Sequence, residues 1–205
     1  MPRPRFDKLS PEKQERILEA AAQEFATYGY AQASLNRILE TAEISKGAAY
    51  YYFDDKADVY LTAVRHYSRT VFESISLDLS TLTAENFWAT ITVVYRQQFA
   101  AFADRPWILG LLKTSGLNVD AMVADEQLAA MLQEVGQMMT TFLQIGQTLG
   151  AVRTDLPDDL LIALLTAVDD THDRWLFSRT EALSEAELNK AAGQVGDLLR
   201  RLLTP

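Results

Sequence analysis

Apolar residues recur along most of the chain at intervals of three and four, which is the spacing of one face of an α-helix. The pattern predicts helices over residues 11–28, 34–42, 45–53, 56–76, 83–103, 106–115, 121–149, 158–179 and 184–203. We therefore expect an all-α fold of about nine helices. The first three helices form an N-terminal head at residues 1–55, residues 56–205 form a C-terminal helical bundle, and the helix at 56–76 connects them.

The helices at 34–42 and 45–53 are very short and almost adjacent, which predicts a helix-turn-helix. Ser34 and Ser45 precede them, where each hydroxyl can accept a hydrogen bond from a free backbone N–H of the first turn. Both helix starts are therefore indicated by chemistry as well as by periodicity.

The second short helix begins Ser45-Lys46-Gly47-Ala48, so its N-terminus carries one long cationic side chain among small residues. Such an end can enter the major groove of DNA. There Lys46 can donate to the O6 and N7 edge of guanine, Gly47 lets the backbone approach, and Ala48 can contact a thymine methyl. We predict that this helix reads DNA sequence.

Three tyrosines follow in this helix. Successive helical residues point about 100° apart, so Tyr50, Tyr51 and Tyr52 cannot share one face, and at least one hydroxyl should reach outward. Outward hydroxyls of Tyr50 and Tyr52 can donate to phosphates. Asp55 is placed to cap the next helix, which puts the charge of Lys56 at a helix N-terminus, where a phosphate is favoured.

In the first short helix, Asn36 and Arg37 lie at the second and third positions after Ser34. Asn36 pairs naturally with adenine, and Arg37 pairs with guanine or a phosphate. Two simpler roles compete with these, because Asn36 can support the cap and Arg37 can be a solvated cation. The predicted DNA contacts are Ser34, Asn36, Arg37, Ser45, Lys46, Gly47, Ala48, Tyr50, Tyr52 and Lys56.

The run S-K-G-A-A-Y-Y-Y-F-D-D-K at residues 45–56 resembles the DNA-binding signature of the TetR family of transcriptional repressors. The resemblance covers residues 12–65, and F-A-T-Y-G-Y at residues 25–30 is similar to the end of the family's first helix. Glu43 stands where the family usually has glycine in the turn, and Leu39 stands where it usually has alanine. A positive φ at Glu43 would cost on the order of 1 kcal/mol. The matching positions are Ala42, Ile44, Ser45, Gly47, Tyr50, Tyr52, Phe53 and Lys56.

The resemblance implies an all-helical homodimer that binds double-stranded operator DNA and represses transcription until a small effector releases it. A transcriptional activator would use the same residues, so that alternative stays open. A second alternative is a helical interaction protein whose head is structural only. Such a head would need no outward donors at Lys46, Tyr50, Tyr52 and Lys56.

The resemblance also implies a cavity between the middle helices that binds an apolar or amphipathic effector. Aromatic and methionine residues are frequent in these helices, and most of them must form the core. Tyr95, Trp107, Met138 and Phe142 are the candidates for lining such a cavity.

The last two helices, at 158–179 and 184–203, carry an apolar face that can pair across a two-fold axis into a four-helix dimer bundle. Glycines Gly193 and Gly196 lie inside the last helix, where each costs about 0.5 to 1 kcal/mol unless another helix approaches closely. The predicted dimer contacts are Leu161, Leu165, His172, Leu188, Ala192, Val195, Gly196, Leu198 and Leu199.

His172 and Asp169 are three residues apart and could share a helix face as two metal ligands. Two ligands do not make a site, and His172 also falls on the apolar seam, so we expect no metal. We expect no cofactor and no enzymatic activity either. Cysteine is absent, and no nucleophile with a base, phosphate loop or zinc motif stands out.

The net charge of the 205 residues is −9, which by itself argues against a nucleic-acid binder. Residues 1–53 are balanced, however, with seven Lys or Arg and seven Asp or Glu, so the excess acid lies in the remainder. Arg3, Arg5 and Lys8 precede the first helix, either as an arm that contacts DNA or as a solvated tail. Without cysteine, a signal sequence or a membrane-spanning stretch, we expect a cytoplasmic protein.

Overall fold

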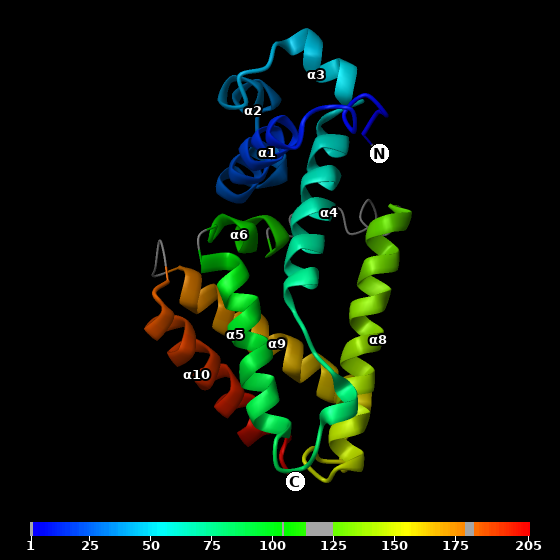
Figure 1. Cartoon of the computed structure of the whole chain (residues 1–205), viewed down its shortest axis with the longest axis vertical. Helices are drawn as coiled ribbons and strands as arrows, with labels where there is room; N and C mark the ends of the chain where they lie inside the picture. The colour runs from blue at the N-terminus through cyan, green and yellow to red at the C-terminus, as the bar shows by residue number, and fades with distance from the viewer. Residues whose placement is uncertain (1, 104, 114–124, 179–182) are drawn as a thin grey trace. The chain divides into compact units, whose positions relative to one another are not determined.

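The computed structural model describes residues 2–103, 105–113, 125–178 and 183–205. Over these ranges the chain forms nine α-helices and one short 3-10 helix, and no strand (Figure 1). The α-helices are α1 (Pro11–Gln32), α2 (Leu35–Thr41), α3 (Lys46–Tyr52), α4 (Lys56–Ser74), α5 (Phe87–Ala103), α6 (Trp107–Lys113), α8 (Glu126–Thr148), α9 (Asp158–Phe177) and α10 (Glu185–Leu203), and the 3-10 helix is η1 (Leu79–Thr81). The predicted all-α fold is confirmed, while the predicted helical residues 114–115, 121–124 and 179 lie outside the described residues.

Several helix boundaries follow the residues that marked them in the sequence, whereas α4 ends at Ser74 rather than at residue 76, and α5 begins at Phe87 rather than at Thr83. Gly29 adopts a φ of 68°, which interrupts α1 shortly before its last turn. Asp55 caps α4, because its Oδ1 accepts a hydrogen bond from the backbone N–H of Asp58 at 2.9 Å. Ser184 and Glu187 form a reciprocal capping box at the start of α10. These ends are set by contacts within a few residues.

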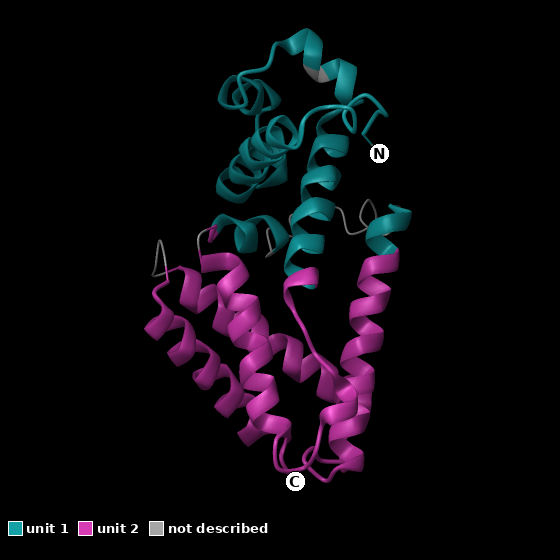
Figure 2. Ribbon diagram, in the orientation of Figure 1, with its two compact units in different colours: residues 1–72, 107–129 teal, residues 73–106, 130–205 magenta. Residues whose placement is uncertain are grey.

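The chain folds into two compact units, residues 1–72 with 107–129 and residues 73–106 with 130–205 (Figure 2). The predicted domain boundary follows residue 55, but the first compact unit also includes most of α4 and all of α6. The predicted division into domains at residues 1–55 and 56–205 therefore stays a prediction. In the part of the chain that the structure describes, no helix combines the length and apolar character needed to cross a bilayer.

The core of the first unit joins α4 and α6 to α1. Tyr60 of α4 is buried with its ring edge-on to Phe25 of α1, at 4.8 Å between centroids. The Tyr60 hydroxyl donates to the carbonyl oxygen of Leu111 in α6 at 3.3 Å. Gly110 lets α6 approach α1, because a Cβ there would lie 3.0 Å from Cβ of Ala26. The head is thus supported by α4, which directly follows it, and by α6, which lies far along the chain.

The core of the second unit packs α5 against α8 and α10. Phe87 of α5 is buried and stacks on Phe142 of α8 at 4.7 Å. A Cβ at Gly146 of α8 would lie 2.6 Å from Cζ of Phe87, and a Cβ at Gly196 of α10 would lie 2.7 Å from Oγ1 of Thr92 in α5. The predicted close helix approach at a glycine of the last helix is confirmed at Gly196.

Candidate nucleic-acid interface

The predicted helix-turn-helix is formed by α2, a turn at residues 42–45 and α3. The Oγ of Ser34 accepts from the N–H of Arg37 at 3.5 Å, and the Oγ of Ser45 accepts from the N–H of Ala48 at 3.3 Å. Both predicted N-caps are therefore confirmed.

Glu43 in the turn adopts a φ of 54°. This is the left-handed backbone conformation that glycine would adopt without strain, and it costs a residue with a Cβ about 1 to 2 kcal/mol. The Glu43 carboxylate lies 3.2 Å from Nη1 of Arg16 on α1, with both side chains exposed. An exposed pair contributes little, so the turn retains most of its strain.

The N-terminal end of α3 is open to solvent. Ser45, Lys46 and Gly47 are exposed, and Ala48 is half-buried. Within the described residues the ammonium of Lys46 has no hydrogen-bond or ion-pair partner. A Cβ at Gly47 would have open space around it, so the backbone there is free to approach another molecule. This end of α3 can therefore meet a DNA groove with a free cation.

The three tyrosines of α3 divide between solvent and the head, as the helical spacing predicts. Tyr50 and Tyr51 are 50% and 48% exposed, whereas Tyr52 is half-buried. Tyr50 and Tyr52 are the predicted phosphate contacts and Tyr51 is not among them, although the run of three tyrosines was a signal for it as well. On exposure alone, Tyr51 is as available to a phosphate as Tyr50.

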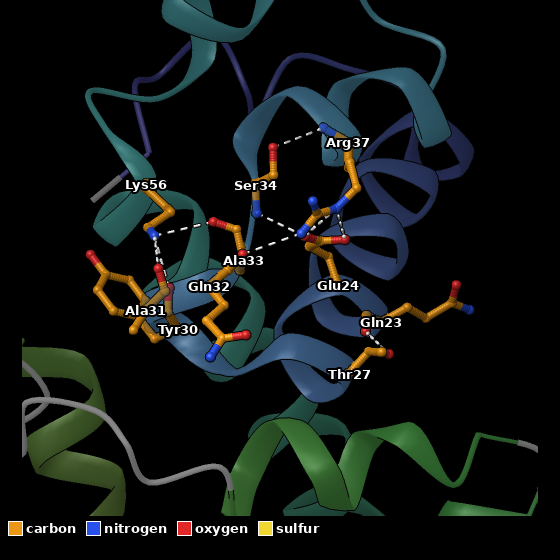
Figure 3. A network of polar contacts seen from close by, with 10 residues as sticks. All are labelled: Gln23, Glu24, Thr27, Tyr30, Ala31, Gln32, Ala33, Ser34, Arg37 and Lys56. Atoms are coloured by element: carbon orange, nitrogen blue, oxygen red, sulfur yellow. Dashed lines mark hydrogen bonds and ion pairs between the residues drawn. The ribbon is translucent and has the colours of Figure 1, made fainter.

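Arg37 is held within the head by Glu24 of α1. Its Nε and Nη2 lie 2.9 Å and 2.5 Å from Oε1 of Glu24, which also accepts from the N–H of Ser34 at 2.7 Å (Figure 3). The guanidinium covers the ring of Tyr28 at 4.4 Å. Burial raises the pKa of Glu24, but the hydrogen bonds and the charge of Arg37 outweigh it, so this pKa lies below its ordinary value. The only sequence signal was a glutamate on the apolar face of α1.

Lys56 fastens the start of α4 to the end of α1. Its Nζ lies 2.8 Å from the carbonyl oxygen of Tyr30, 3.3 Å from that of Ala31 and 3.2 Å from that of Ala33 (Figure 3). An ammonium has three N–H donors, so each has an acceptor in the DNA-free protein. The predicted phosphate contact of Lys56 stays a prediction, and it would compete with these carbonyls.

The segment before α1 is docked on the end of α3. Arg3 donates from Nη1 to the carbonyl oxygen of Tyr50 at 2.8 Å and from Nη2 to Oδ1 of Asp54 at 2.6 Å. Phe6 is 3% exposed and packs against Phe53 at 4.9 Å between ring centroids. The prediction for this arm rested on its charges alone, and the sequence signal for its docking is Phe6, the single aromatic residue in residues 2–9.

The four residues predicted to line an effector cavity have different surroundings. Trp107 belongs to the first compact unit, where its ring meets Tyr67 edge-on at 4.9 Å. Phe142 lies in the aromatic stack with α5, Met138 is half-buried on α8, and Tyr95 is buried on α5. Their contacts with an effector stay predictions. A separate groove of about 660 Å³ is lined by Gln133, Gly136, Gln137, Thr140, Thr141 and Ile162.

Tyr95 belongs to a buried polar cluster between α5 and α9. Burial raises its pKa well above the ordinary value, reinforced by the charges of Asp169 and Asp173 and by a hydrogen bond with Asp169. His172 is 7% exposed and stacks on Phe99 at 5.7 Å, and its Nδ1 lies 4.0 Å from Oδ1 of Asp173. Neither ring nitrogen of His172 has a hydrogen-bond partner among the described residues. Within those residues, no three His, Asp or Glu are grouped so as to hold a metal ion.

Most of the predicted dimer contacts are core residues of a single chain. Leu161, His172, Leu188, Ala192, Val195, Gly196 and Leu199 are all buried without a partner chain. Their surface is already covered by helices of their own chain, as Gly196 is by α5. Leu165 is half-buried and Leu198 is 49% exposed, so these two keep surface for a partner. Leu160 and Trp175 of α9, each 44% exposed, add to the apolar surface that α9 and α10 present.

A capped helix-turn-helix whose second helix exposes a cation with no partner among the described residues is typical of helix-turn-helix DNA-binding proteins. The sequence pattern described as "Bacterial regulatory proteins, tetR family" matches residues 17–63. Residues 17–63 of this chain therefore match the DNA-binding part of the TetR family of transcriptional regulators.

Similar proteins match this chain over most of its length. The HTH-type transcriptional repressor AcnR of Corynebacterium diphtheriae is 29% identical over 163 residues, which is 79% of each protein. Among solved structures, a TetR family transcriptional regulator from Chloroflexus aurantiacus is similar over 100% of this chain and 99% of its own, with 23% identity and a TM-score of 0.74. The transcriptional regulator FadR from Bacillus subtilis, solved in complex with stearoyl-CoA, covers 90% of this chain and 96% of its own, with 18% identity and a TM-score of 0.65. At these sequence identities the two structural matches support the fold and nothing further.

Proposed function

We propose that this protein is a repressor that binds operator DNA as a homodimer and leaves it when a small effector binds. The observation that carries the proposal is the exposed N-terminus of α3, where Lys46 has no partner among the described residues. The relative from Corynebacterium diphtheriae is named a repressor, which favours repression over activation. The proposal includes action in the cytoplasm, where operator DNA lies, and control without catalysis.

The proposal assigns different tasks to the predicted DNA contacts. Lys46 reads a base edge, and Ser45, Gly47 and Ala48 let α3 approach it. Tyr50 and Tyr51 donate to phosphates. Asn36 lies exposed on α2 and contacts a base or the backbone.

Arg37 and Lys56 act mainly on the geometry of the head in this proposal. Their donors are engaged with Glu24 and with the carbonyls at the end of α1 in the DNA-free protein. A contact with DNA would be an additional role for either side chain.

Effector control requires a link between ligand binding and the spacing of two heads. Successive major grooves are reached when the heads of a dimer lie about 34 to 36 Å apart. We infer that α4 transmits the effect of ligand binding to the spacing of the heads. Tyr60 joins α4 to α6, and Arg65 joins it to Asp125 just before α8. The Arg65 and Asp125 side chains are 12% and 6% exposed, so this ion pair is shielded from salt. The effector needs only to bind the DNA-incompetent arrangement better.

We infer that a polar group of the effector is held near Tyr95 and His172. The buried imidazole makes no hydrogen bond within the described residues, so both of its nitrogens have hydrogen bonds to offer, and Phe99 supplies an apolar wall beside it. An amphipathic ligand suits this combination. Stearoyl-CoA, the ligand of the Bacillus subtilis neighbour, is a reasonable first probe.

The test selects bound DNA from random duplexes with the purified protein. We expect a motif with two-fold symmetry, and we expect binding to fall when an effector is added. Selection of no motif would favour the alternative of a helical interaction protein with a structural head.

The effector site is tested by thermal shift with stearoyl-CoA, its free acid and shorter acyl-CoAs. Tyr95→Phe and His172→Phe should abolish the shift produced by whichever ligand stabilises the parent protein, while the unliganded Tm changes little. A shift unchanged in both variants would move the site away from this cluster.

A further inference from the structure

The arm at residues 2–9 is bound to the C-terminal end of the recognition helix α3 by several contacts. The backbone N–H of Arg3 donates to the carbonyl oxygen of Tyr52 at 2.8 Å, and its Nη1 donates to that of Tyr50 at 2.8 Å. Nε and Nη2 of Arg3 both donate to Oδ1 of Asp54, at 2.9 Å and 2.6 Å. Phe6 anchors the arm, because it is buried against Phe53.

A helix such as α3 needs support from outside. It has seven residues, and isolated helices of this length are not stable in water. The last carbonyls of a helix have no partner within the helix, and α3 carries no basic residue in its last turn. Gly47 in its first turn lowers its helix propensity further. Arg3 therefore supplies donors where the helix itself has none.

We propose that Arg3 is a positioning residue for sequence reading: it closes the C-terminal end of α3 and so sets the orientation of the N-terminal end that carries Lys46. The inference rests on the proposed function, in which α3 reads the operator. Arg3 acts through α3 and contacts no base. Its hydrogen bonds fix both the end of the helix and Asp54, which lies two residues beyond it.

The hydrogen bonds of Arg3 argue against a direct phosphate contact. Three of its five N–H donors, one on each nitrogen, are engaged within the head, and its charge is paired with Asp54. Neutralising a phosphate would require breaking this pair. Arg3 should therefore contribute little to the salt dependence of binding.

Arg5 provides a matched control in the same arm. Its guanidinium lies over the ring of Tyr51 at 3.8 Å. Within the described residues it makes no hydrogen bond to α3. Arg3→Met and Arg5→Met each remove one cation of equal size, and only the first removes hydrogen bonds to the end of α3.

The experiment measures the affinity of both variants for the selected duplex and for a random duplex at several salt concentrations. Hydrogen exchange of the DNA-free proteins is measured alongside. For Arg3→Met we expect the ratio of selected to random affinity to fall about tenfold, comparable with losing one base-pair contact, at an unchanged salt slope. The amides of α3 should exchange about tenfold faster while those of α1 keep their protection. Arg5→Met should leave this ratio and the α3 exchange unchanged.

A third variant, Arg3→Lys, separates charge from geometry. A single ammonium cannot reproduce the planar set of donors that bridges Asp54 and Tyr50, so the affinity ratio should stay low. Full recovery by lysine would overturn the proposal. So would an equal loss on both duplexes with a salt slope reduced by about one, which is the result for a phosphate contact.

The hydrogen-exchange result stands apart from DNA binding. If the parent protein selected no motif, the proposed function would fail, and faster exchange confined to α3 in Arg3→Met would still support the role of Arg3 in holding this helix. Unchanged exchange in α3 would overturn that role whatever the DNA result.

Discussion

At the scale of single residues, the head separates charged side chains that support the fold from those left for DNA. Glu24, Arg37 and Lys56 are engaged within the head, and Lys46 is free among the described residues. A charged side chain that is already held within the fold loses its conformational freedom on folding and makes its contacts without DNA. Lys46 makes no contact that would support the fold among the described residues, so we propose it as the residue that reads the DNA sequence.

Lys46→Ala should weaken binding to the preferred half-site by roughly 1 to 3 kcal/mol and relax preference at one symmetric pair of positions. Binding to random duplexes should fall much less, because the lost contact is to a base edge. The measurement repeats DNA selection and titration with the variant, with Lys190→Ala on α10 as the control for net charge. A uniform loss on all sequences with the same motif would make Lys46 a phosphate contact and leave DNA shape as the source of specificity.

Glu24→Gln should destabilise the protein by about 1 to 3 kcal/mol at pH 7, because the ion pair with Arg37 is lost in a buried position. The native pKa of Glu24 lies below its unfolded value, so its contribution is present above the ordinary glutamate range and is lost as the pH falls through the native pKa. Urea unfolding from pH 7 to pH 3 should therefore show the difference between parent and variant shrinking. Glu40→Gln, at an exposed site on α2, is the control. If the difference in unfolding free energy between the parent and Glu24→Gln stayed constant with pH, the ionisation of Glu24 would not contribute to stability.

At the scale of the elements, two backbone features set how helices meet. The turn between α2 and α3 places Glu43 at positive φ, and the contact of α10 with α5 depends on the missing side chain of Gly196. At position 43 the conformation favours glycine, but the sequence has glutamate. At position 196 the sequence has glycine despite the cost of glycine inside a helix.

Glu43→Gly should be more stable than Glu43→Ala by about 1 kcal/mol, because alanine retains the positive-φ strain and glycine does not. Both variants lose the exposed pair with Arg16, so that effect cancels in the comparison. Urea denaturation of the two proteins measures the difference. Equal stabilities would mean that the turn relaxes to another conformation when the glutamate is removed.

Gly196→Ala should destabilise the protein by about 1 to 3 kcal/mol, because its Cβ would be forced against the Thr92 hydroxyl, which is itself hydrogen-bonded to the carbonyl of Trp88. Gly193→Ala in the same helix is the matched control, since a Cβ there meets nothing within 4 Å in the chain. That variant should gain about 0.5 to 1 kcal/mol from helix propensity. Thermal unfolding of both variants measures these effects. If Gly196→Ala were as stable as the parent, α5 would have to shift at this contact to make room for the Cβ.

At the scale of the whole molecule, dimerisation depends on what a single chain leaves exposed. Most of the apolar residues predicted to form the dimer interface are buried in the core of the second unit. Leu198 remains exposed on α10, with Leu160 and Trp175 on α9. An interface built from these residues would be smaller than the full stripe suggested.

Leu198→Glu should convert the proposed dimer to a monomer, because a charge buried without a partner at a two-fold contact costs several kcal/mol. The folded monomer should survive, since Leu198 is 49% exposed in a single chain. Light scattering gives the mass, and Val93→Glu on α5, at a site 52% exposed, is the control. If the Leu198 variant stayed dimeric and the Val93 variant dissociated, the interface would lie on α5.

Local sequence is enough to predict the helices, several of their ends and the helix-turn-helix, although the start of α5 was placed at Thr83 and lies at Phe87. These features depend on contacts between residues a few positions apart, such as the Ser34 and Ser45 caps, the break at Gly29 and the capping box of Ser184 with Glu187. Such contacts are encoded in spacing, so the pattern of apolar residues and cap residues is enough to predict them. The cation at the start of α3 followed from the same local reasoning.

Only the tertiary structure decided which predicted site residues are free. Arg37 is bound by Glu24, 13 residues earlier, and Lys56 by carbonyls 23 to 26 residues earlier, so spacing could not reveal either contact. The apolar stripe of α10 was visible in the sequence, but its partner was not, because an apolar face fits the core of its own chain and the surface of a second chain equally well. Burial of that stripe is settled only when α5 packs against it through Gly196 and Thr92.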